Sequence, residues 1–365
     1  MKWAWRVGKL AGIDLKIHVT FLLILGWVGL LHWRAEGTTE AVVRGVVFIL
    51  LLFGCVVLHE LGHALTARRF GVKTRDIILL PIGGVARLER MPEKPSQELL
   101  VAIAGPLVNV VIAGGLFAVL AAAGRWVPLQ ELAQEPSITR GPLFQQLAVI
   151  NVTLAVFNLI PAFPMDGGRI LRALLATRLD YVRATQIAAA IGQVFAFGLG
   201  FLGLFSNPFL VFIAFFVWIG AAQEASAVEL RNRLEGISVG QVMLTDFRAL
   251  HPFDTLSNAI DLTMAGSQVD FPVVDSGRAI GVLTQQKLLA ALRGGGPEQR
   301  VQTVMEREFE HADPHDLVEP LLQRLQEKRQ RTVPVVAHDS LVGLLTVDNI
   351  GEYFAIQSAL KKAGG

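Results

Sequence analysis

Two histidines four residues apart, with a glutamate between them, are well suited to metal chemistry. His59, Glu60 and His63 belong to the sequence His-Glu-Leu-Gly-His. Residues four apart on a helix share one face, so the two imidazoles can hold one Zn²⁺. The glutamate can act as general base toward a water molecule activated by that metal. The same pattern occurs by chance in unrelated proteins, as a pair of core histidines with a capping glutamate.

The setting of this histidine motif favours the metal interpretation. Residues 45–58, which lead directly into it, are almost purely apolar. Ionisable side chains at membrane depth are costly and are typical of functional sites. We therefore expect a metal site inside a membrane.

The composition indicates a membrane protein. The chain has 365 residues, 52% of them hydrophobic and 18% charged, with a mean hydropathy of +0.49. Such values imply several membrane spans. The net charge of +2 does not suggest nucleic-acid binding, so we expect no nucleic-acid partner. The lipid bilayer is the expected surrounding of the apolar segments. The single cysteine, Cys55, excludes a disulfide framework and a cysteine metal site.

Apolar segments of about 20 residues predict six transmembrane helices. With the N-terminus inside, the external segments carry as basic residues only Arg34, Arg44, Arg125 and Arg140. The positive-inside rule therefore predicts a multi-pass protein of the cell membrane with cytoplasmic N- and C-termini. The predicted spans are residues 17–33, 42–67, 97–123, 143–164, 185–205 and 208–228.

Asp166 is the candidate for the third protein ligand that a catalytic zinc needs. The second span places His63 near its cytoplasmic end, and the fourth span returns Asp166 to the same side of the membrane. Pro161 and Pro164 break the fourth helix just before it, and unwound backbone at membrane depth is tolerated where it lines a cavity. Alternatively, Asp166 and Gly167 form a plain interfacial turn.

The histidine motif and a second motif together resemble a known family. Residues 158–169 have the sequence NLIPAFPMDGGR. In this order, the two motifs look like those of the site-2 proteases, which are intramembrane zinc metalloproteases. The resemblance covers residues 1–230.

This resemblance implies a role for five residues. One Zn²⁺ per chain is expected on His59, His63 and Asp166. Glu60 is expected to be the catalytic glutamate, and Asn158 to help hold the substrate carbonyl or the oxyanion. The implied reaction is hydrolysis of peptide bonds in the transmembrane segments of single-pass membrane proteins.

Two further segments are similar to the same family. Residues 75–90 are too short to span a membrane, and Pro81 argues against a helix. In the family a membrane-inserted β-hairpin lies here, whose edge can pair with an extended substrate strand; the alternative is an interfacial loop. Gly105 lies in an Ala-Gly-Pro sequence like the family's glycine-proline motif, and we interpret it, with Asn109 and Ala113, as a small-residue packing face.

The C-terminal part contains an internal repeat. Residues 272–274 and 281–284 recur, 62 positions later, as residues 334–336 and 343–346. Each repeat predicts the order strand, helix, strand, strand, helix. The repeats resemble tandem cystathionine-β-synthase (CBS) domains, which form a soluble α/β Bateman module.

The CBS resemblance implies an adenine nucleotide such as ATP or AMP between the repeats. Thr284 and Thr346 occupy the position that typically contacts ribose or phosphate. The acid that usually follows three residues later is replaced by Lys287 and Asn349, which puts ribose binding by a carboxylate in doubt. The module can instead be a plain dimerisation platform, and we expect a homodimer through it.

The predicted fold is a polytopic α-helical membrane protein with six transmembrane helices and a short membrane-associated β-hairpin, followed by a soluble α/β tandem CBS module. We place the transmembrane zinc metalloprotease domain at 1–230, the first CBS domain at 231–293 and the second at 298–357. The predicted function is intramembrane proteolysis regulated by the CBS module. The alternatives are a CBS-regulated metal ion transporter and a proteolytically silent zinc-binding scaffold.

Overall fold

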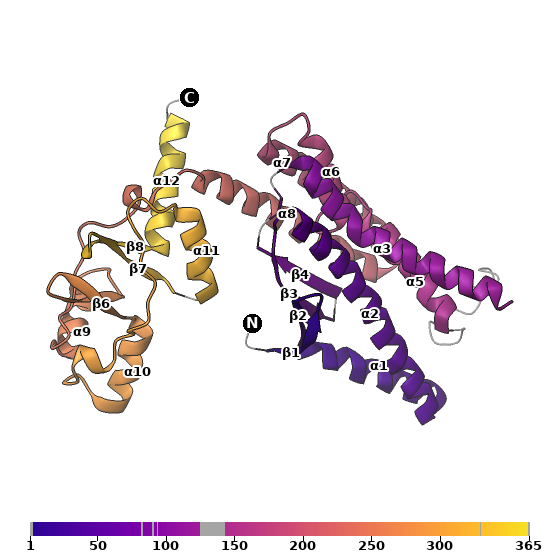
Figure 1. Cartoon of the computed structure of the whole chain (residues 1–365), viewed down its shortest axis with the longest axis horizontal. Helices are drawn as coiled ribbons and strands as arrows, with labels where there is room; N and C mark the ends of the chain where they lie inside the picture. Colours follow the sequence, from indigo (N-terminus) through magenta and orange to yellow (C-terminus); the bar gives the residue numbers. More distant parts are fainter. Residues whose placement is uncertain are drawn as a thin grey trace. The chain divides into compact units, whose positions relative to one another are not determined.

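The structure is a computed structural model that describes residues 3–81, 83–89, 91–92, 94–124, 143–328 and 330–363. The chain divides into two compact units, Met1–Val228 and Glu229–Gly365, and each is described by itself (Figure 1). Two of the arginines assigned to external segments, Arg125 and Arg140, lie outside the described residues.

The first unit is built mainly from apolar helices. Within the described residues, four helices are long and apolar enough to cross a membrane, namely α2 (Thr39–Arg69), α3 (Pro95–Ala122), α7 (Tyr181–Phe205) and α8 (Pro208–Leu234). The helices matching the first and fourth predicted spans, α1 and α5, have 17 and 16 residues. Six spans therefore stays a prediction. The helices are α1 (Thr20–Glu36), α2 (Thr39–Arg69), α3 (Pro95–Ala122), α5 (Leu143–Asn158), α6 (Asp166–Leu175), α7 (Tyr181–Phe205) and α8 (Pro208–Leu234).

Local sequence signals set the ends of these helices. The Thr38 hydroxyl accepts the Ala41 N–H at the start of α2, and Asp180 accepts the Arg183 N–H at the start of α7. Such caps satisfy backbone donors that a first helical turn leaves free. Pro208 starts α8, where its missing N–H costs nothing.

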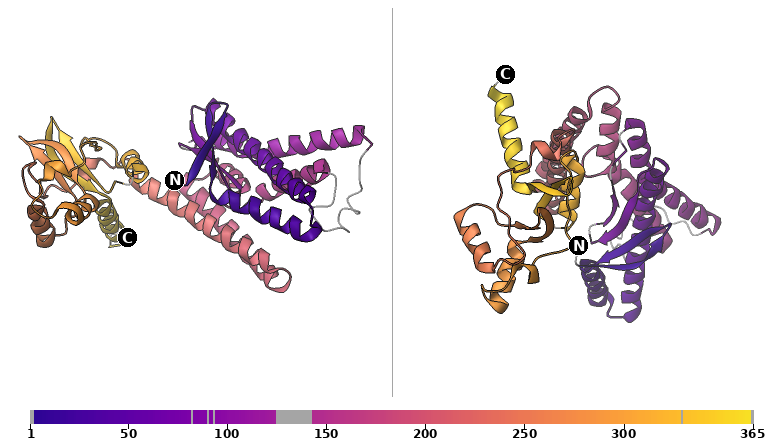
Figure 2. Two further views of the ribbon diagram at one scale, coloured as in Figure 1. Left: turned by 90° about the horizontal axis from the view of Figure 1, so that it is seen from below. Right: turned by 60° about the vertical axis from the view of Figure 1, so that its left-hand side comes forward.

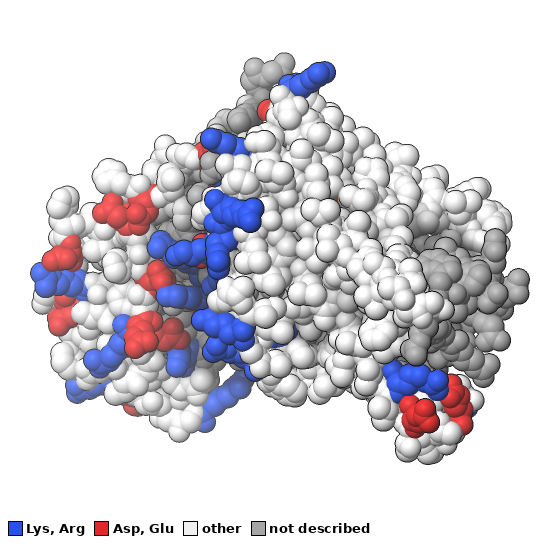
Figure 3. Space-filling model, turned by 45° about the vertical axis from the view of Figure 1, so that its right-hand side comes forward, with Lys and Arg blue, Asp and Glu red and all other residues white. Residues whose placement is uncertain are grey.

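The outward surface of the first unit is apolar. Large side chains of α7 such as Val194, Phe197 and Phe205 are exposed. Figure 3 shows a wide surface without charged residues. An apolar surface of this extent is typical of contact with lipid, so the chain is a multi-pass membrane protein.

A four-stranded sheet lies beside α1 and α2 (Figure 1). Its outer pairs are antiparallel hairpins and its central pair is parallel. The sequence predicted the second hairpin and missed the first, which turns at Ala11 and Gly12, both with positive φ. The association of the sheet with the membrane stays a prediction. The strands, in order, are β1 (Ala4–Leu10), β2 (Ile13–His18), β3 (Thr74–Leu80) and β4 (Gly83–Leu88).

Asp76 of β3 fastens the strands on either side of it. Its buried carboxylate accepts hydrogen bonds from Lys16 of β2 and from Nε of Arg87 of β4, both at 2.5 Å. Burial raises the pKa of Asp76, but the hydrogen bonds and positive charges of Arg87 and Lys16 outweigh it, so the pKa lies below its ordinary value. The ion cluster holds β4 against β3.

The second unit contains two similar halves. Each half pairs two antiparallel strands and adds two helices. The strand predicted at the start of each repeat is reduced to one bridge, Leu250 to Val273 and Ala312 to Val335. The elements are α9 (Leu256–Ala265), β5 (Phe271–Asp275), β6 (Arg278–Leu283), α10 (Gln285–Gly295), α11 (Val318–Lys328), β7 (Thr332–Ala337), β8 (Ser340–Thr346) and α12 (Val347–Ala363), with 3₁₀ turns at Val239–Gln241 and Val301–Thr303.

Candidate metal centre

Three metal-binding side chains meet in the first unit. His59 and His63 lie one turn apart on α2, and Asp166 is the first residue of α6. The two Nε2 atoms are 3.1 Å apart, and Asp166 Oδ2 lies 3.2 Å from that of His59 and 3.1 Å from that of His63. All three side chains are buried. The structure therefore brings together residues proposed from two separate motifs.

The spacing of these atoms fits one zinc ion. Zinc bonds of about 2.0–2.1 Å to nitrogen place tetrahedral ligand atoms roughly 3.3 Å apart. His63 Nδ1 lies 2.7 Å from the Val101 carbonyl oxygen and donates its proton there, which leaves the Nε2 lone pair for a metal. Two ring nitrogens and a carboxylate oxygen that converge in this way form a donor set suited to zinc.

His59, His63 and Asp166 form a candidate ligand trio, and the backbone of α3 passes against its two histidines at a glycine. A Cβ atom built on Gly105 would lie 2.2 Å from His63 Nε2 and 2.7 Å from His59 Nε2. The burial of Gly105 agrees with the packing role expected from the sequence. Its contact with the ligands was not predicted, although a glycine inside a helix, which costs about 1 kcal/mol relative to alanine, is a signal of close approach.

Glu60 contacts the edge of the sheet. It follows His59 on α2, about 100° around the helix. Its Oε2 accepts the N–H of Ala86, 2.9 Å away on the edge strand β4. A Cβ atom on Gly84 would come within 2.8 Å of Glu60 Cγ, so the strand backbone lies directly against this side chain. The sheet therefore orients the carboxylate of the residue next to the candidate ligand His59.

Asn158 is less closely tied to this centre. It is the last residue of α5, and within the described residues its side chain makes no hydrogen bond to the ligand trio. The segment that joins it to Asp166 is tightly folded, because a Cβ atom on Gly167 would lie 2.1 Å from the Ile160 carbonyl oxygen. The role of Asn158 at the oxyanion stays a prediction.

A buried ion cluster beside α6 was not predicted at all. The Arg172 side chain is 1% exposed and forms salt bridges with Glu98 of α3 and Glu224 of α8. The available signal was the presence of two acidic residues within apolar helices, where an unpaired charge is expensive.

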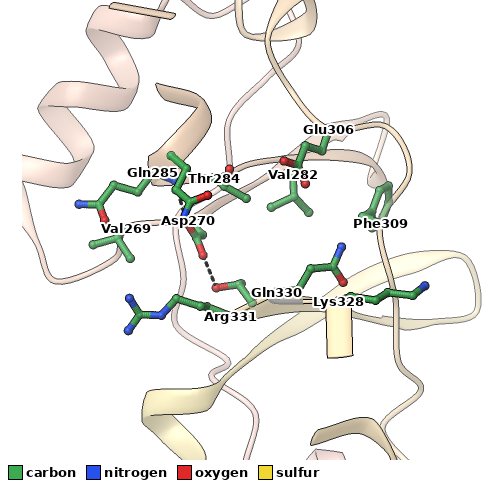
Figure 4. A pocket seen from close by; sticks show the side chains of 12 residues that line it. Val269, Asp270, Val282, Thr284, Gln285, Glu306, Phe309, Lys328, Gln330 and Arg331 are labelled. Carbon is green, nitrogen blue, oxygen red and sulfur yellow. Dashed lines mark hydrogen bonds between the residues drawn. The ribbon is translucent and has the colours of Figure 1, made fainter. Parts of the chain in front are cut away.

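The second unit holds a cavity of about 250 Å³ between its two halves. Thr284 and Asp270 line it from the first half, and Lys328, Arg331 and Thr332 from the second (Figure 4). Asp270 Oδ2 accepts the Thr332 hydroxyl proton at 2.8 Å, which joins the halves. The two cations, Lys328 and Arg331, were not predicted.

The second proposed nucleotide contact lies elsewhere. Thr346 is not among the residues that line this cavity, and its hydroxyl accepts the N–H of Asn349 at 3.1 Å in the first turn of α12. Lys287 does not line it either. Of the two threonines proposed to contact a nucleotide, only Thr284 lines the cavity.

Comparison with known proteins identifies both halves of the chain. The model of peptidase family M50 matches residues 47–139 and 129–199. The CBS domain model matches residues 239–294 and 301–355. Each match falls within one of the two units.

Two relatives and one solved structure are similar to this chain. A zinc metalloprotease of Methanocaldococcus jannaschii is 37% identical over 285 residues, which cover 78% of each chain. Stage IV sporulation protein FB of Bacillus subtilis is 30% identical over 207 residues, 55% of this chain and 62% of that protein. The solved structure of the site-2 protease from Methanocaldococcus jannaschii is 40% identical and covers 61% of this chain and 95% of its own, with a TM-score of 0.45.

Proposed function

Because this chain belongs to peptidase family M50, as a zinc metallo-endopeptidase of the site-2 protease type with tandem CBS domains, we propose that it cleaves peptide bonds within the transmembrane segments of other proteins. The observation that carries the proposal is the convergence of His59, His63 and Asp166 among apolar helices. Glu60, the proposed general base, directly follows His59 in the sequence. Single-pass membrane proteins are the proposed substrates.

The side chains of this centre have distinct tasks. Zinc, when bound by the trio, supplies a Lewis acid that polarises a carbonyl and lowers the pKa of water to about 7. Glu60 takes a proton from the water whose oxygen bonds to the carbonyl carbon, and returns a proton to the amine nitrogen as the C–N bond breaks. The Ala86 N–H orients this carboxylate for both transfers. Asn158 donates its amide N–H to the developing oxyanion.

The edge strand β4 supports a mode of substrate binding. A peptide bond in a helix is shielded, because its neighbours occupy its polar groups. β4 is a terminal strand of the sheet, and its backbone lies against Glu60 at Gly84 and Ala86. The unwound substrate segment pairs with this edge, which brings an extended peptide beside the general base.

Membrane orientation and assembly form part of the same proposal. Arg68 and Arg69 end α2 just beyond His63, which supports a centre near the cytoplasmic face. Both termini then lie in the cytoplasm if the chain spans six times. The CBS module is proposed to regulate cleavage and to form the homodimer contact.

Removal of zinc distinguishes the proposed protease activity from the alternative, metal ion transport. Purified protein in proteoliposomes is expected to hold one zinc per chain and to cleave a reporter that carries one transmembrane segment. A chelator should abolish cleavage, and one equivalent of zinc should restore it. Elemental analysis and gel analysis of the reporter measure both effects. Metal influx with a trapped indicator, without any cleavage, would instead establish the transporter.

An adenine nucleotide is the proposed ligand of the cavity in the second unit. Lys328 and Arg331 pair with Glu310 and Asp348 in the structure, and exchanging these partners for a phosphate keeps both positive charges compensated. Thr284 supplies a hydroxyl. The carboxylate of Asp270 already accepts from Thr332 and from the Gln285 backbone, so it is committed to joining the two halves. Phosphate recognition by the cations therefore contributes most to binding.

Substitution of Arg331 by alanine is expected to weaken ATP or AMP binding to the whole protein roughly 10- to 100-fold, because one charge-assisted hydrogen bond contributes roughly 1.5–3 kcal/mol. Titration calorimetry gives the dissociation constant. Arg278→Ala is the matched control, since Arg278 is exposed and pairs with Asp339 outside the cavity. Equal affinities for all three proteins would argue against this site, and no binding by the native protein would favour a plain dimerisation module.

A further inference from the structure

Helix α6 carries a zinc ligand at its first residue and a buried arginine at its seventh. Asp166 starts the helix, and its Oδ1 lies 3.8 Å from Nη1 of Arg169. Arg172 follows three residues later, one turn beyond Arg169 and about 120° around this ten-residue helix from Asp166. Whatever holds Arg172 therefore fixes the position of the ligand at the start of α6.

Arg172 is held from several directions. Its Nε donates to Glu98 Oε1 of α3 at 2.8 Å, and its Nη1 donates to Glu224 Oε1 of α8 at 2.5 Å. The guanidinium carbon lies 5.1 Å from the ring centre of Phe163 and 4.9 Å from that of Tyr181. One side chain thus joins α6 to α3, to α8, to the first residue of α7 and to the loop before Asp166.

Glu98 lies on the same helix, α3, that contacts the two histidines of the metal centre. Glu98, Val101 and Gly105 lie at spacings of three and four along one face of α3. The carbonyl of Val101 accepts from His63 Nδ1, and Gly105 touches both histidines. The same helix face therefore positions the histidines directly and Asp166 through Arg172.

Helix α8 reinforces this arrangement through a second contact. One turn before Glu224, a Cβ atom on Gly220 would lie 2.7 Å from Cδ of Pro164. Figure 2 (left, salmon) shows α8 as one continuous helix. Its face at Gly220 and Glu224 thus contacts both the loop before Asp166 and the helix after it.

Stability alone does not account for this cluster. Burying a guanidinium and a carboxylate costs several kcal/mol per ion, and apolar side chains of similar volume often stabilise a core equally well. Glu98 Oε2 is also buried without a hydrogen-bond partner in the described part of the chain. Directional, charge-assisted bonds are suited to fixing geometry.

We propose that Arg172 is a positioning residue for zinc binding: it holds α6 so that the Asp166 carboxylate stays in register with His59 and His63, with Glu98 and Glu224 as its anchors. This inference rests on the proposed zinc-dependent function. Outer contacts of metal ligands typically change metal affinity 10- to 100-fold.

The test compares zinc affinity with stability in detergent-solubilised full-length protein. Arg172→Met is expected to weaken zinc binding about 10- to 100-fold by chelator competition, and to lower kcat with little change in KM. The double substitution Glu98→Gln with Arg172→Met removes the lone buried charge and should recover melting temperature, but not zinc affinity. Arg183→Met, at an exposed arginine on α7, is the control.

Each outcome decides a separate point. Zinc affinity that recovers together with melting temperature in the double variant would make Arg172 merely structural and overturn the proposal, as would native affinity in Arg172→Met. Should Arg172→Met fail to fold, Arg172→Lys keeps the charge but cannot bridge two carboxylates as a guanidinium does, and the same two readouts apply. Absence of zinc from the native protein would refute the proposed function itself.

Discussion

Replacement of Glu60 by glutamine is expected to abolish cleavage of a membrane-anchored reporter while zinc stays bound at one ion per chain. The amide keeps the size of the carboxylate, and its oxygen can still accept the Ala86 N–H. It cannot take a proton from water, so the rate should fall by at least about 10²–10⁴-fold, the usual contribution of a general base. Single-turnover cleavage and elemental analysis of the same sample measure both quantities.

The Glu60→Gln comparison has a matched control in Glu36→Gln. Glu36 ends α1 and pairs with Arg44 through an exposed contact, so its loss should leave cleavage unchanged. Undiminished cleavage by the Glu60 variant would remove this residue from the mechanism. Loss of zinc together with activity would assign Glu60 to the metal site instead of to proton transfer.

Substitution of Gly105 by alanine is expected to have the second large effect, although it alters no ligand. The added methyl group would lie 2.2 Å from His63 Nε2, a separation that no real side chain tolerates. Either the histidine leaves the trio or α3 moves away from α2, and both displace a donor atom from the metal. We expect zinc affinity to fall at least about 100-fold, together with loss of cleavage.

Two other glycines of the same helix provide the comparison. A Cβ atom on Gly114 or on Gly115 meets no atom within 4 Å in the described structure, so alanine there should leave zinc affinity and cleavage at native values. Alanine also favours a helix by up to about 1 kcal/mol over glycine. Normal zinc binding by Gly105→Ala would show that α3 does not cross the ligands as described.

The metal centre was accessible from sequence because its residue types are chemically distinctive. His59 and His63 have the spacing of one helical turn, and an apolar context made their presence expensive. Counting membrane crossings then placed Asp166 on the same side as the pair. The structure brings the three side chains together, and β3 and β4 pair antiparallel in the segment where a membrane-associated hairpin was expected, although its association with the membrane stays a prediction.

Other parts of the fold could not be predicted from the sequence, because they depend on contacts between residues far apart along the chain. Arg172 and Glu98, which form a salt bridge, are 74 residues apart in the sequence. No helical or strand periodicity in the sequence indicates that two such distant residues are in contact. Strand β2 pairs in parallel with β3, far along the chain, so the N-terminal segment looked like a basic tail. Its clue was Gly12 directly before the alternating apolar residues Ile13, Leu15 and Ile17, a pattern typical of a strand that follows a turn.

The boundary between the two units falls at Val228, inside α8, which runs on to Leu234. A chain truncated at this boundary would leave Glu224 in a terminal turn, where helices fray and opening requires little free energy. Fraying there would loosen the anchor of Arg172, so inactivity of that short form would resemble loss of activation by the CBS module. Ending the shortened protein after Leu234 keeps Glu224 more than two turns from the new terminus, and this longer form separates damage at the metal centre from the regulatory effect of removing the module.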